Sequence, residues 1–381
     1  MTADQLDVRQ EVYPLDVALC GGCGHVQLLQ VVDPRILFEN YVYVSGTSQV
    51  FVDHFRRYAH DVVEKLAVAP GSLVVDIGSN DGTLLRCFKE EGCAVLGIDP
   101  ALSIAAAATA SGIETLPRFF TAELAREVRD SHGPAAVVTA NNVFAHIDDL
   151  RGVLEGVRTL LAPDGVFVFE VSYLVDVYEK TLFDTIYHEH LSYHSVKPLI
   201  AFFESNGMSL IDAERVPSHG GSLRGFAMLA GGPRPVSPGV AGLVGLEGRL
   251  GLDRAPTFAS FAARIDGLRD QLTTLLAELK RKGDRIAGFG APAKATTLLH
   301  HFRLGSGVLD YIVDESPLKQ GLYTPGQHIP VVAARAMAES PPDHLLILAW
   351  NFAEPIMAKN AGFGGDFIVP LPELLVRRAA G

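Results

Sequence analysis

The stretch that decides the fold is Leu73-Val74-Val75-Asp76-Ile77-Gly78-Ser79-Asn80-Asp81-Gly82. Its first half is a short apolar run that predicts a buried strand ending in an acidic residue, and its second half is made of small and polar residues that predict a tight turn. Glycine lets the backbone approach a ligand, and a helix starting near Thr83 offers free N–H groups. The stretch therefore predicts a strand, a ligand-binding turn and a helix.

The same alternation continues on the C-terminal side of this stretch. Strands are predicted at 73–77, 94–98, 136–140 and 166–170, and helices at 82–91, 103–111, 121–130 and 150–161. Alternation of this kind implies a parallel sheet with covered faces, so the fold class is α/β and Rossmann-like. A second strand, loop and helix unit begins at Arg285, and strands at 308–313 and 344–348 extend the pattern.

The chain is expected to contain three domains and a linker. Residues 1–65 form a small cap with a Cys-x-x-Cys knuckle and an amphipathic helix, whose apolar positions are Phe55, Ala59, Val62, Val63 and Leu66. Residues 66–230 form the first Rossmann-like domain. The Gly- and Pro-rich segment 231–257 is predicted to be a linker. Residues 258–381, opening with a long helix over 258–282, form a second Rossmann-like domain.

Composition narrows the range of functions. With 381 residues and 48% hydrophobic content the chain can bury a large core, and its net charge of −12 makes nucleic acid an unexpected partner. No apolar stretch reaches the roughly 20 residues needed to cross a bilayer, and the N-terminus is polar, so we expect a cytoplasmic protein without a membrane partner. Four cysteines are too few for a disulfide framework. Oligomeric state is not predicted.

The glycine turn favours S-adenosylmethionine as its ligand. Asp99 ends the next strand, about 20 residues downstream, where an acidic side chain can take both hydroxyls of a ribose. NAD is less favoured because the third glycine of G-x-G-x-x-G is replaced by Thr83. The other alternative is a turn with a purely structural role. The predicted donor-binding residues are Asp76, Gly78, Asn80, Asp81, Gly82, Asp99, Phe120, Asn141 and Asn142. Phe120 would flank the adenine unless it is simply core.

A run rich in imidazole and phenol groups carries the candidate chemistry. It reads Tyr187-His188-Glu189-His190-Leu191-Ser192-Tyr193-His194. A carboxylate neighbour can orient a histidine and tune it into a working base near neutral pH. A solvated loop and a metal site are the alternatives, although a helical His pair for zinc is absent.

Taken together, these motifs resemble the NDP-4-keto-deoxysugar C-methyltransferases, especially the sugar 3-C-methyltransferases. The resemblance runs from Cys20 and Cys23 through 41–48, the donor turn and the Tyr187 run to His219–Arg224 and 288–294. It implies a small zinc-binding domain, a class I methyltransferase domain and a C-terminal domain that helps to hold the nucleotide-linked sugar. It further implies that His190 is the base, with Glu189, Tyr187, Tyr41 and His146 around the sugar.

The second glycine turn predicts the rest of the substrate site. It follows a strand at 285–287, contains Gly290 and Lys294, and leads into a helix, an arrangement suited to a diphosphate unless the domain only packs. Arg224 and Asn351 are further candidates for substrate contacts. Other loop or strand-end positions that could shape the nucleotide pocket are Asp310, Asp314, Lys319, Gln320 and Trp350.

We expect no complete zinc site. The resemblance implies two Cys-x-x-Cys pairs, but the sequence contains only Cys20 and Cys23 as such a pair, and two cysteines cannot complete a tetrahedral structural site. Cys87 and Cys93 fall in the methyltransferase domain, and His25 is a third candidate ligand. The N-terminus is then either truncated or has lost its metal.

The predicted reaction is methylation of a carbon next to a ketone. His190 would remove the proton alpha to the 4-keto group, Tyr41 and His146 would donate hydrogen bonds to the ketone oxygen, and the enolate carbon would take the methyl group. The first alternative is an O- or N-methyltransferase acting on a sugar or another small metabolite. A catalytically silent nucleotide-sugar-binding protein and a nicotinamide oxidoreductase are the others.

Overall fold

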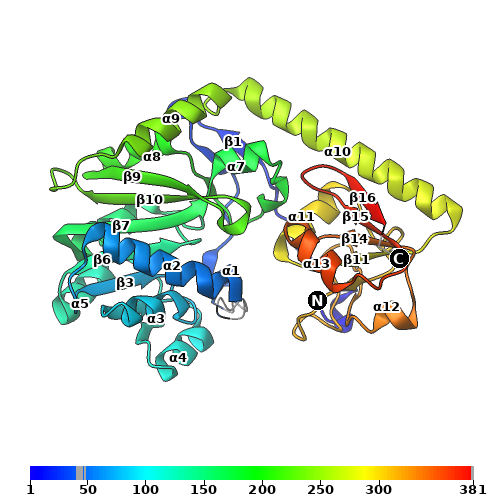
Figure 1. Cartoon of the computed structure of the whole chain (residues 1–381), viewed down its shortest axis with the longest axis horizontal. Coiled ribbons are helices and arrows are strands. Elements are labelled where there is room, and N and C mark those ends of the chain that lie inside the picture. The colour runs from blue at the N-terminus through cyan, green and yellow to red at the C-terminus, as the bar shows by residue number, and fades with distance from the viewer. Residues whose placement is uncertain (40–45, 47–48, 379–381) are drawn as a thin grey trace. The chain divides into compact units, whose positions relative to one another are not determined.

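The computed structural model describes residues 1–39, 46 and 49–378 (Figure 1). The chain divides into two units, each with its own hydrophobic core. The larger unit comprises Asp16–Val175 and His188–Arg254. The smaller unit comprises Met1–Leu15, Asp176–Tyr187 and Ala255–Gly381.

The larger unit is built on a seven-stranded sheet with the order β5-β4-β3-β6-β7-β10-β9. The first five strands are parallel, and β10 pairs antiparallel with both of its neighbours. The strands are β3 (Leu73–Ile77), β4 (Ala94–Ile98), β5 (Thr115–Leu116), β6 (Ala135–Asn141), β7 (Leu161–Ser172), β9 (Met208–Val216) and β10 (Ser222–Leu229). The chain order reverses between β3 and β6, and ligands of open α/β sheets bind at the carboxyl ends of strands at such a point.

Helices cover this sheet. They are α3 (Thr83–Glu90), α4 (Leu102–Ala110), α5 (Ala122–His132), α6 (Leu150–Leu160) and α8 (Val196–Ser205). Helix α2 (Gln49–Leu66) packs on one face of the sheet, where its buried side chains meet those of β3, β6, β7 and β10 (Figure 1). Four of the five predicted apolar positions of α2 are buried, and Val63 is half-buried. The predicted amphipathic helix is confirmed.

A second sheet of the larger unit joins the N-terminal knuckle to the end of the Tyr187 run. Strands β1 (Val17–Leu19), β2 (Val26–Leu28) and β8 (Ser192–Tyr193) pair antiparallel, with Val26 opposite Tyr193. Residues 187–189 form a bend and a turn before β8. Helix α1 (Pro34–Phe38) follows β2, and its first turn is capped by the Asp33 carboxylate.

The predicted linker over 231–257 is wrong over half of its length. Residues Pro238–Leu250 form helix α9, because Ser237 caps its first turn, Pro238 occupies the first helical position and Gly251 ends it with φ +66°. Glu247 of α9 is 4% exposed and its carboxylate accepts hydrogen bonds from Val196 N, Lys197 N and the Tyr173 hydroxyl at 2.6, 3.0 and 2.8 Å.

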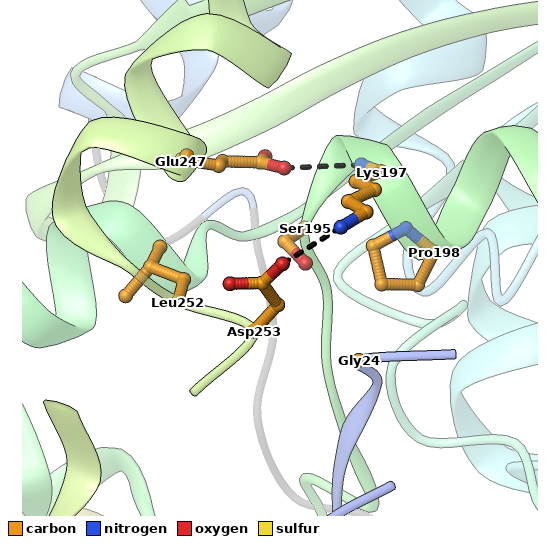
Figure 2. A pocket seen from close by; sticks show the side chains of 8 residues that line it. Gly24, Ser195, Lys197, Pro198, Glu247, Leu252 and Asp253 are labelled. Carbon is orange, nitrogen blue, oxygen red and sulfur yellow. Dashed lines mark hydrogen bonds and ion pairs between the residues drawn. The ribbon is translucent and has the colours of Figure 1, made fainter. Parts of the chain in front are cut away.

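Glu247 and Lys197 also line a small cavity of about 20 Å³, beside which Lys197 pairs with Asp253 (Figure 2). A space of this size is about that of one water molecule. Helix α9 is therefore an integral part of the larger unit and fixes the start of α8.

The smaller unit has a six-stranded sheet with the order β13-β12-β11-β14-β15-β16, of which only β16 runs antiparallel to its neighbour. The strands are β11 (Ile286–Phe289), β12 (Ile312–Val313), β13 (Val331–Val332), β14 (His344–Ile347), β15 (Asp366–Val369) and β16 (Leu375–Arg378). The helices are α10 (Ala255–Lys282), α11 (Ala293–His301), α12 (Ala336–Glu339) and α13 (Ala353–Lys359). The expected second Rossmann-like unit is thus present.

The segment Asp176–Tyr187 belongs to this smaller unit because Val177, Leu182 and Phe183 are buried in its core. It contains the end of α7 (Leu174–Glu179) and a short 3-10 helix, Phe183–Thr185. Further 3-10 turns lie at Ala3–Gln5, Ser218–Gly220 and Trp350–Phe352.

The strand predicted over 308–313 is shorter than expected. Only Ile312–Val313 pairs as β12, because Val308 and Leu309 donate their N–H groups back to the Gly305 carbonyl and form a turn. No helix of the described residues combines the length and apolar character needed to cross a bilayer.

Candidate functional site

The turn after β3 requires glycine at two positions. Gly78 has φ +70° and donates its N–H to the Ile98 carbonyl at 2.7 Å. A Cβ at Gly78 would lie 2.3 Å from Val143 Cγ2, and one at Gly82, where φ is +75°, would lie 2.9 Å from Ile113 Cγ2. Any other residue at these positions would meet both backbone strain and a steric clash. The turn therefore keeps the bare backbone beside the carboxyl end of β3.

Two buried carboxyl groups end the neighbouring strands β3 and β4. Asp76 is 4% exposed and accepts a hydrogen bond from Thr139 Oγ1 at 2.6 Å; burial, against this bond, raises the pKa of Asp76 to about 7. Asp99 accepts the N–H groups of Asn80 and Ala101, both at 2.9 Å, and burial raises its pKa as well. Asp99 thus shapes the turn in addition to its predicted contact with the ribose.

Asp81 has a local role that the sequence did not indicate. Its Oδ1 accepts hydrogen bonds from Thr83 N at 3.2 Å and Thr83 Oγ1 at 2.7 Å, which satisfies the start of α3. Its Oδ2 accepts the Gly46 N–H at 3.0 Å. The predicted donor contact of Asp81 stays a prediction.

The end of β6 supplies polar groups that fit a polar ligand. Both the amide oxygen and nitrogen of Asn141 are buried, and within the described residues neither makes a hydrogen bond of good geometry, although the Tyr58 phenol is close to the amide; Ser79 Oγ likewise has no such bond. Buried polar groups normally have partners, so these orphaned groups suit a ligand that carries an amine and a carboxylate. Asn142 has φ +55° and donates its N–H to the Glu170 carbonyl at 2.7 Å. The residues present therefore fit S-adenosylmethionine.

Phe120 packs against helix α6. A Cβ at Gly156 would lie 2.7 Å from Phe120 Cε1, so the ring rests on that glycine. Phe120 is half-buried in this position, and its predicted place beside an adenine stays a prediction.

Two predicted acceptor-site histidines come together. The rings of His146 and His190 lie 5.0 Å apart at 32°, and Phe38 stacks on His146 at 5.7 Å and 5°. The Ala145 carbonyl brings the two segments together, because it accepts the N–H groups of Leu191 and Ser192 at 2.9 and 3.1 Å. His146 therefore lies in the loop that follows β6, and these bonds bring the segment of His190, which precedes β8, beside that loop.

The remaining predicted catalytic residues have different positions. Glu189 is half-buried in the turn just before His190. Tyr187 is half-buried and belongs to the smaller unit. Tyr41 lies outside the described residues. Their roles stay predictions.

The sequence did not predict a buried charged group at the end of β7, which we call the Glu170 cluster: Glu170, His54, Arg224, Ser218 and Tyr58. Glu170 is 2% exposed and accepts hydrogen bonds from His54 Nε2 at 2.9 Å, from Arg224 Nε and Nη2 at 3.2 and 3.1 Å, and from Ser218 Oγ. The Arg224 guanidinium lies 4.2 Å from the centre of the Tyr58 ring. Burial raises the pKa of the fully buried Tyr58 phenol.

This cluster changes the interpretation of Arg224. The side chain is 5% exposed and pairs with Glu170, so the predicted contact with a diphosphate would have to compete with a buried ion pair and stays a prediction. A signal was present in the sequence. Glu170 and Arg224 each lie among apolar neighbours within a strand, and charges in such positions are buried only when they are paired. His54 and Tyr58 lie four residues apart and so share one face of α2.

The smaller unit repeats the geometry of the first turn. Gly290 has φ +84° and donates its N–H to the Val313 carbonyl at 2.7 Å, as Gly78 does to Ile98. Asp314, at the end of β12, accepts the Ala291 and Ser316 N–H groups at 2.7 and 2.9 Å. The Gly290 turn is thus built like the donor turn. In addition, Asp314 Oδ2 lies 3.4 Å from Lys319 Nζ.

Lys294 is held by side chains of its own unit. Its ammonium lies 3.6 Å from the buried Asp184 carboxylate and 4.2 Å from the centre of the Trp350 ring, and Trp350 Nε1 donates to Asp184 at 2.6 Å. Burial lowers the pKa of Lys294. Its predicted diphosphate contact would have to compete with this pairing, whereas Asn351 is exposed.

The Cys20 and Cys23 knuckle offers two of the four ligands of a structural zinc site. The turn is closed by Cys20 N donating to the His25 carbonyl at 2.8 Å and Gly24 N donating to the Cys20 carbonyl at 2.9 Å, and both thiols are exposed. Within the described part of the chain no three potential ligands come together, and His25 Nε2 lies 3.2 Å from Ser192 Oγ. These residues alone do not fit a complete zinc site.

Three family models match the chain along its length. Residues 1–38 match a zinc-binding domain, residues 51–213 a methyltransferase domain, and residues 217–372 a C-methyltransferase C-terminal domain. The match over residues 1–38 agrees with the small zinc-binding domain that the resemblance implies.

Relatives with known activities agree with these matches. The C-methyltransferase NovU of Streptomyces niveus is 40% identical over 98% of this chain and 90% of its own length. A ubiquinone biosynthesis O-methyltransferase of Rhodopseudomonas palustris is 31% identical over 28% of this chain and 42% of its own length. Among solved structures, magnesium protoporphyrin IX methyltransferase of Synechocystis with bound S-adenosylmethionine has a TM-score of 0.35 and 16% identity, covering 51% of this chain and 88% of that one.

Proposed function

The chain belongs to the C-methyltransferase family of NovU and is an S-adenosylmethionine-dependent methyltransferase, and from this premise we propose that its acceptor is a nucleotide-linked 4-keto deoxysugar. The methyl group goes to the carbon next to the ketone. The observation that carries the proposal is the pair of imidazoles, His146 after β6 and His190 before β8, whose rings lie 5.0 Å apart.

Methylation at carbon needs two groups at the acceptor. A saturated carbon has no lone pair, so a base must first remove a proton beside a carbonyl, and a hydrogen-bond donor must stabilise the negative charge that develops on the carbonyl oxygen. Two neighbouring imidazoles can divide these tasks between them, since one can accept a proton while the other donates a hydrogen bond.

In this proposal His190 removes the proton and His146 donates to the ketone oxygen. Glu189, Tyr187 and Tyr41 complete the surroundings of the sugar. Bound S-adenosylmethionine supplies an electrophilic methyl group on a sulfonium. The backbone around Gly78 and the buried groups Asp76, Asp99 and Asn141 hold the donor at the carboxyl ends of β3, β4 and β6.

The smaller unit is proposed to hold the nucleotide. The Gly290 turn offers backbone N–H groups at the start of α11, and the exposed Asn351 is available for a polar contact. Lys294 contributes less than the sequence suggests because Asp184 already pairs with it.

Hydrogen exchange at carbon tests the proposal. The full chain, a non-methylating donor analogue and a TDP-4-keto-6-deoxy sugar are combined in deuterated water, and proton and deuterium content at the carbons flanking the ketone is followed by NMR. We expect one carbon-bound hydrogen to exchange, and H190N to slow exchange and methylation by about 100-fold or more. The exposed His132 of α5 provides the control, H132N, with unchanged rates.

Several results would contradict this function. If methylation of the sugar proceeds without carbon exchange, the acceptor atom is oxygen or nitrogen. If the wild-type chain binds the donor but neither exchanges nor methylates the sugar, the acceptor class is wrong. Equal rates for H190N and H132N would remove His190 from the mechanism.

A further inference from the structure

The Glu170 cluster lies at the same carboxyl edge as the donor turn. Glu170 is aligned with Asn141 in the pairing of β7 and β6, and its carbonyl accepts the Asn142 N–H at 2.7 Å. The loop that starts at Asn142 leads within four residues to His146. A buried charged cluster at this position adjoins the edge where the donor is proposed to bind, and only Arg224 of this cluster was given a role by the sequence.

Histidine is the side chain most often used to accept and donate protons near neutral pH, and His54 is the histidine of this cluster. Its Nε2 lies 2.9 Å from Glu170 Oε1, and because a carboxylate only accepts, Nε2 carries the hydrogen. In the neutral ring Nδ1 is then the basic nitrogen. No described residue hydrogen-bonds to Nδ1, and the side chain is 14% exposed, so the ring is not sealed from water.

The carboxylate that orients His54 is itself fixed. Arg224 gives Glu170 two hydrogen bonds and Ser218 gives it a third. Burial acts to raise the pKa of Glu170, but His54, Arg224 and Ser218 outweigh it and the pKa is lowered. Glu170 therefore remains ionised at neutral pH.

The surrounding charges leave room for a proton on His54. The charged groups of the cluster and its neighbours are Glu170 on β7, Arg224 on β10, and Asp61 on α2, whose carboxylate lies 3.9 Å from Arg224 Nη1. Two negative charges and one positive charge are balanced when His54 becomes an imidazolium. Buried charges are tolerated when they are paired in this way.

We propose that His54 is a proton-transfer residue of the methyl-transfer site. Each turnover replaces one hydrogen of the acceptor with a methyl group and so releases one proton. In the proposal, which rests on the proposed function, His190 breaks the carbon–hydrogen bond, and the proton is then taken up at His54 Nδ1. The resulting imidazolium gives it to water and returns to the neutral ring, so charge and protons balance over the cycle.

The same helix provides a matched control. His60 lies on α2, but it is exposed and its partners, Glu64 and Glu91, are surface carboxylates. H54Q keeps an N–H that can reach Glu170 while removing the titratable ring, and H60Q makes the same chemical change at the surface. H54A opens space in which added imidazole can replace the missing ring.

The first measurement is turnover with a 4-keto nucleotide sugar. We expect H54Q to lower kcat by about 100-fold with little change in KM for the donor, and H60Q to behave like wild type. Added imidazole should restore turnover of H54A in proportion to its neutral form. Wild-type turnover in H54Q, or a loss that imidazole does not relieve, would overturn the proposal.

The second measurement needs only the donor. The pKa of His54 is measured by NMR with S-adenosylhomocysteine and with sinefungin, which carries an ammonium group in place of the methyl sulfonium. We expect sinefungin to lower the pKa of His54 by about half a unit or more relative to S-adenosylhomocysteine, with His60 unaffected, because a nearby positive charge disfavours the imidazolium. Equal values in both complexes would place His54 away from the transferred methyl group, whatever the acceptor proves to be.

Discussion

At the scale of single residues, His194 makes stability depend on pH. It is 1% exposed, it stacks on Phe144 at 5.3 Å and 15°, and burial lowers its pKa to about 3. The unfolded chain binds a proton at this residue below about pH 6.5, whereas the folded chain does not. The contribution of His194 is therefore fully present above about pH 6.5 and is lost as the pH falls toward 3.

Replacing His194 by phenylalanine should remove this dependence. We expect the free energy of unfolding of wild type, relative to H194F, to fall by about 2 kcal/mol between pH 7 and pH 5. Urea denaturation at each pH measures it. The comparison between variants is necessary because Asp76, with a pKa raised to about 7, acts in the opposite direction over the same range. If the free energy of unfolding changed with pH in the same way for wild type and H194F, His194 would take up its proton in the folded chain as readily as in the unfolded chain.

The sequence was most informative at positions whose backbone conformation allows only one residue type. Gly78 and Gly82 were identified from sequence because only glycine fits a positive φ beside a packed side chain. The pairing of Arg224 and the position of His54 were missed because they depend on a partner far away in the chain, Glu170. Pairing of this kind leaves no local pattern in one sequence.

At the scale of elements, helix α9 should hold the start of α8 in place. Removing the Glu247 carboxylate in E247A leaves Val196 N, Lys197 N and the buried Tyr173 hydroxyl without their acceptor, and we expect a loss of about 3 kcal/mol in the free energy of unfolding. K197A is the control, since it removes only the exposed pair with Asp253 and should cost at most about 1 kcal/mol. Denaturant titrations of both variants give the comparison, and equal losses would show that the Glu247 contacts add little.

Elements with a clear hydrophobic period were predicted almost to the residue. Strands β3 and β4 have the predicted bounds, and α2 buries the predicted stripe. Helix α9 was missed because its five glycine and proline residues resemble a loop, while the features that make it a helix are a Ser237 cap and a buried Glu247. Tertiary contacts overrode local propensity there.

At the scale of the whole molecule, the two cores should respond to different ligands. Hydrogen exchange followed by mass spectrometry should show S-adenosylhomocysteine protecting backbone amides of 73–83, 94–101 and 135–142 in the larger unit. Thymidine diphosphate should protect 286–294 in the smaller unit, because a ligand stabilises the part of the fold that binds it. Protection of 286–294 by S-adenosylhomocysteine alone would instead assign the second glycine turn to the donor.

The predicted division into successive domains captured the two Rossmann-like sheets but not how the chain is shared between them. Residues 1–15 and 176–187 were placed with the first domains, yet both segments belong to the smaller unit. Such insertions are invisible to composition, because Val177, Leu182 and Phe183 would be equally apolar in either core.

The insertion of Asp176–Tyr187 into the smaller unit limits how genes of this family can recombine. A single crossover that exchanged the C-terminal half for that of a relative would separate Val177, Leu182 and Phe183 from the core they evolved to fill. Hybrids that exchange the smaller unit should therefore inherit this short stretch together with residues 255–381.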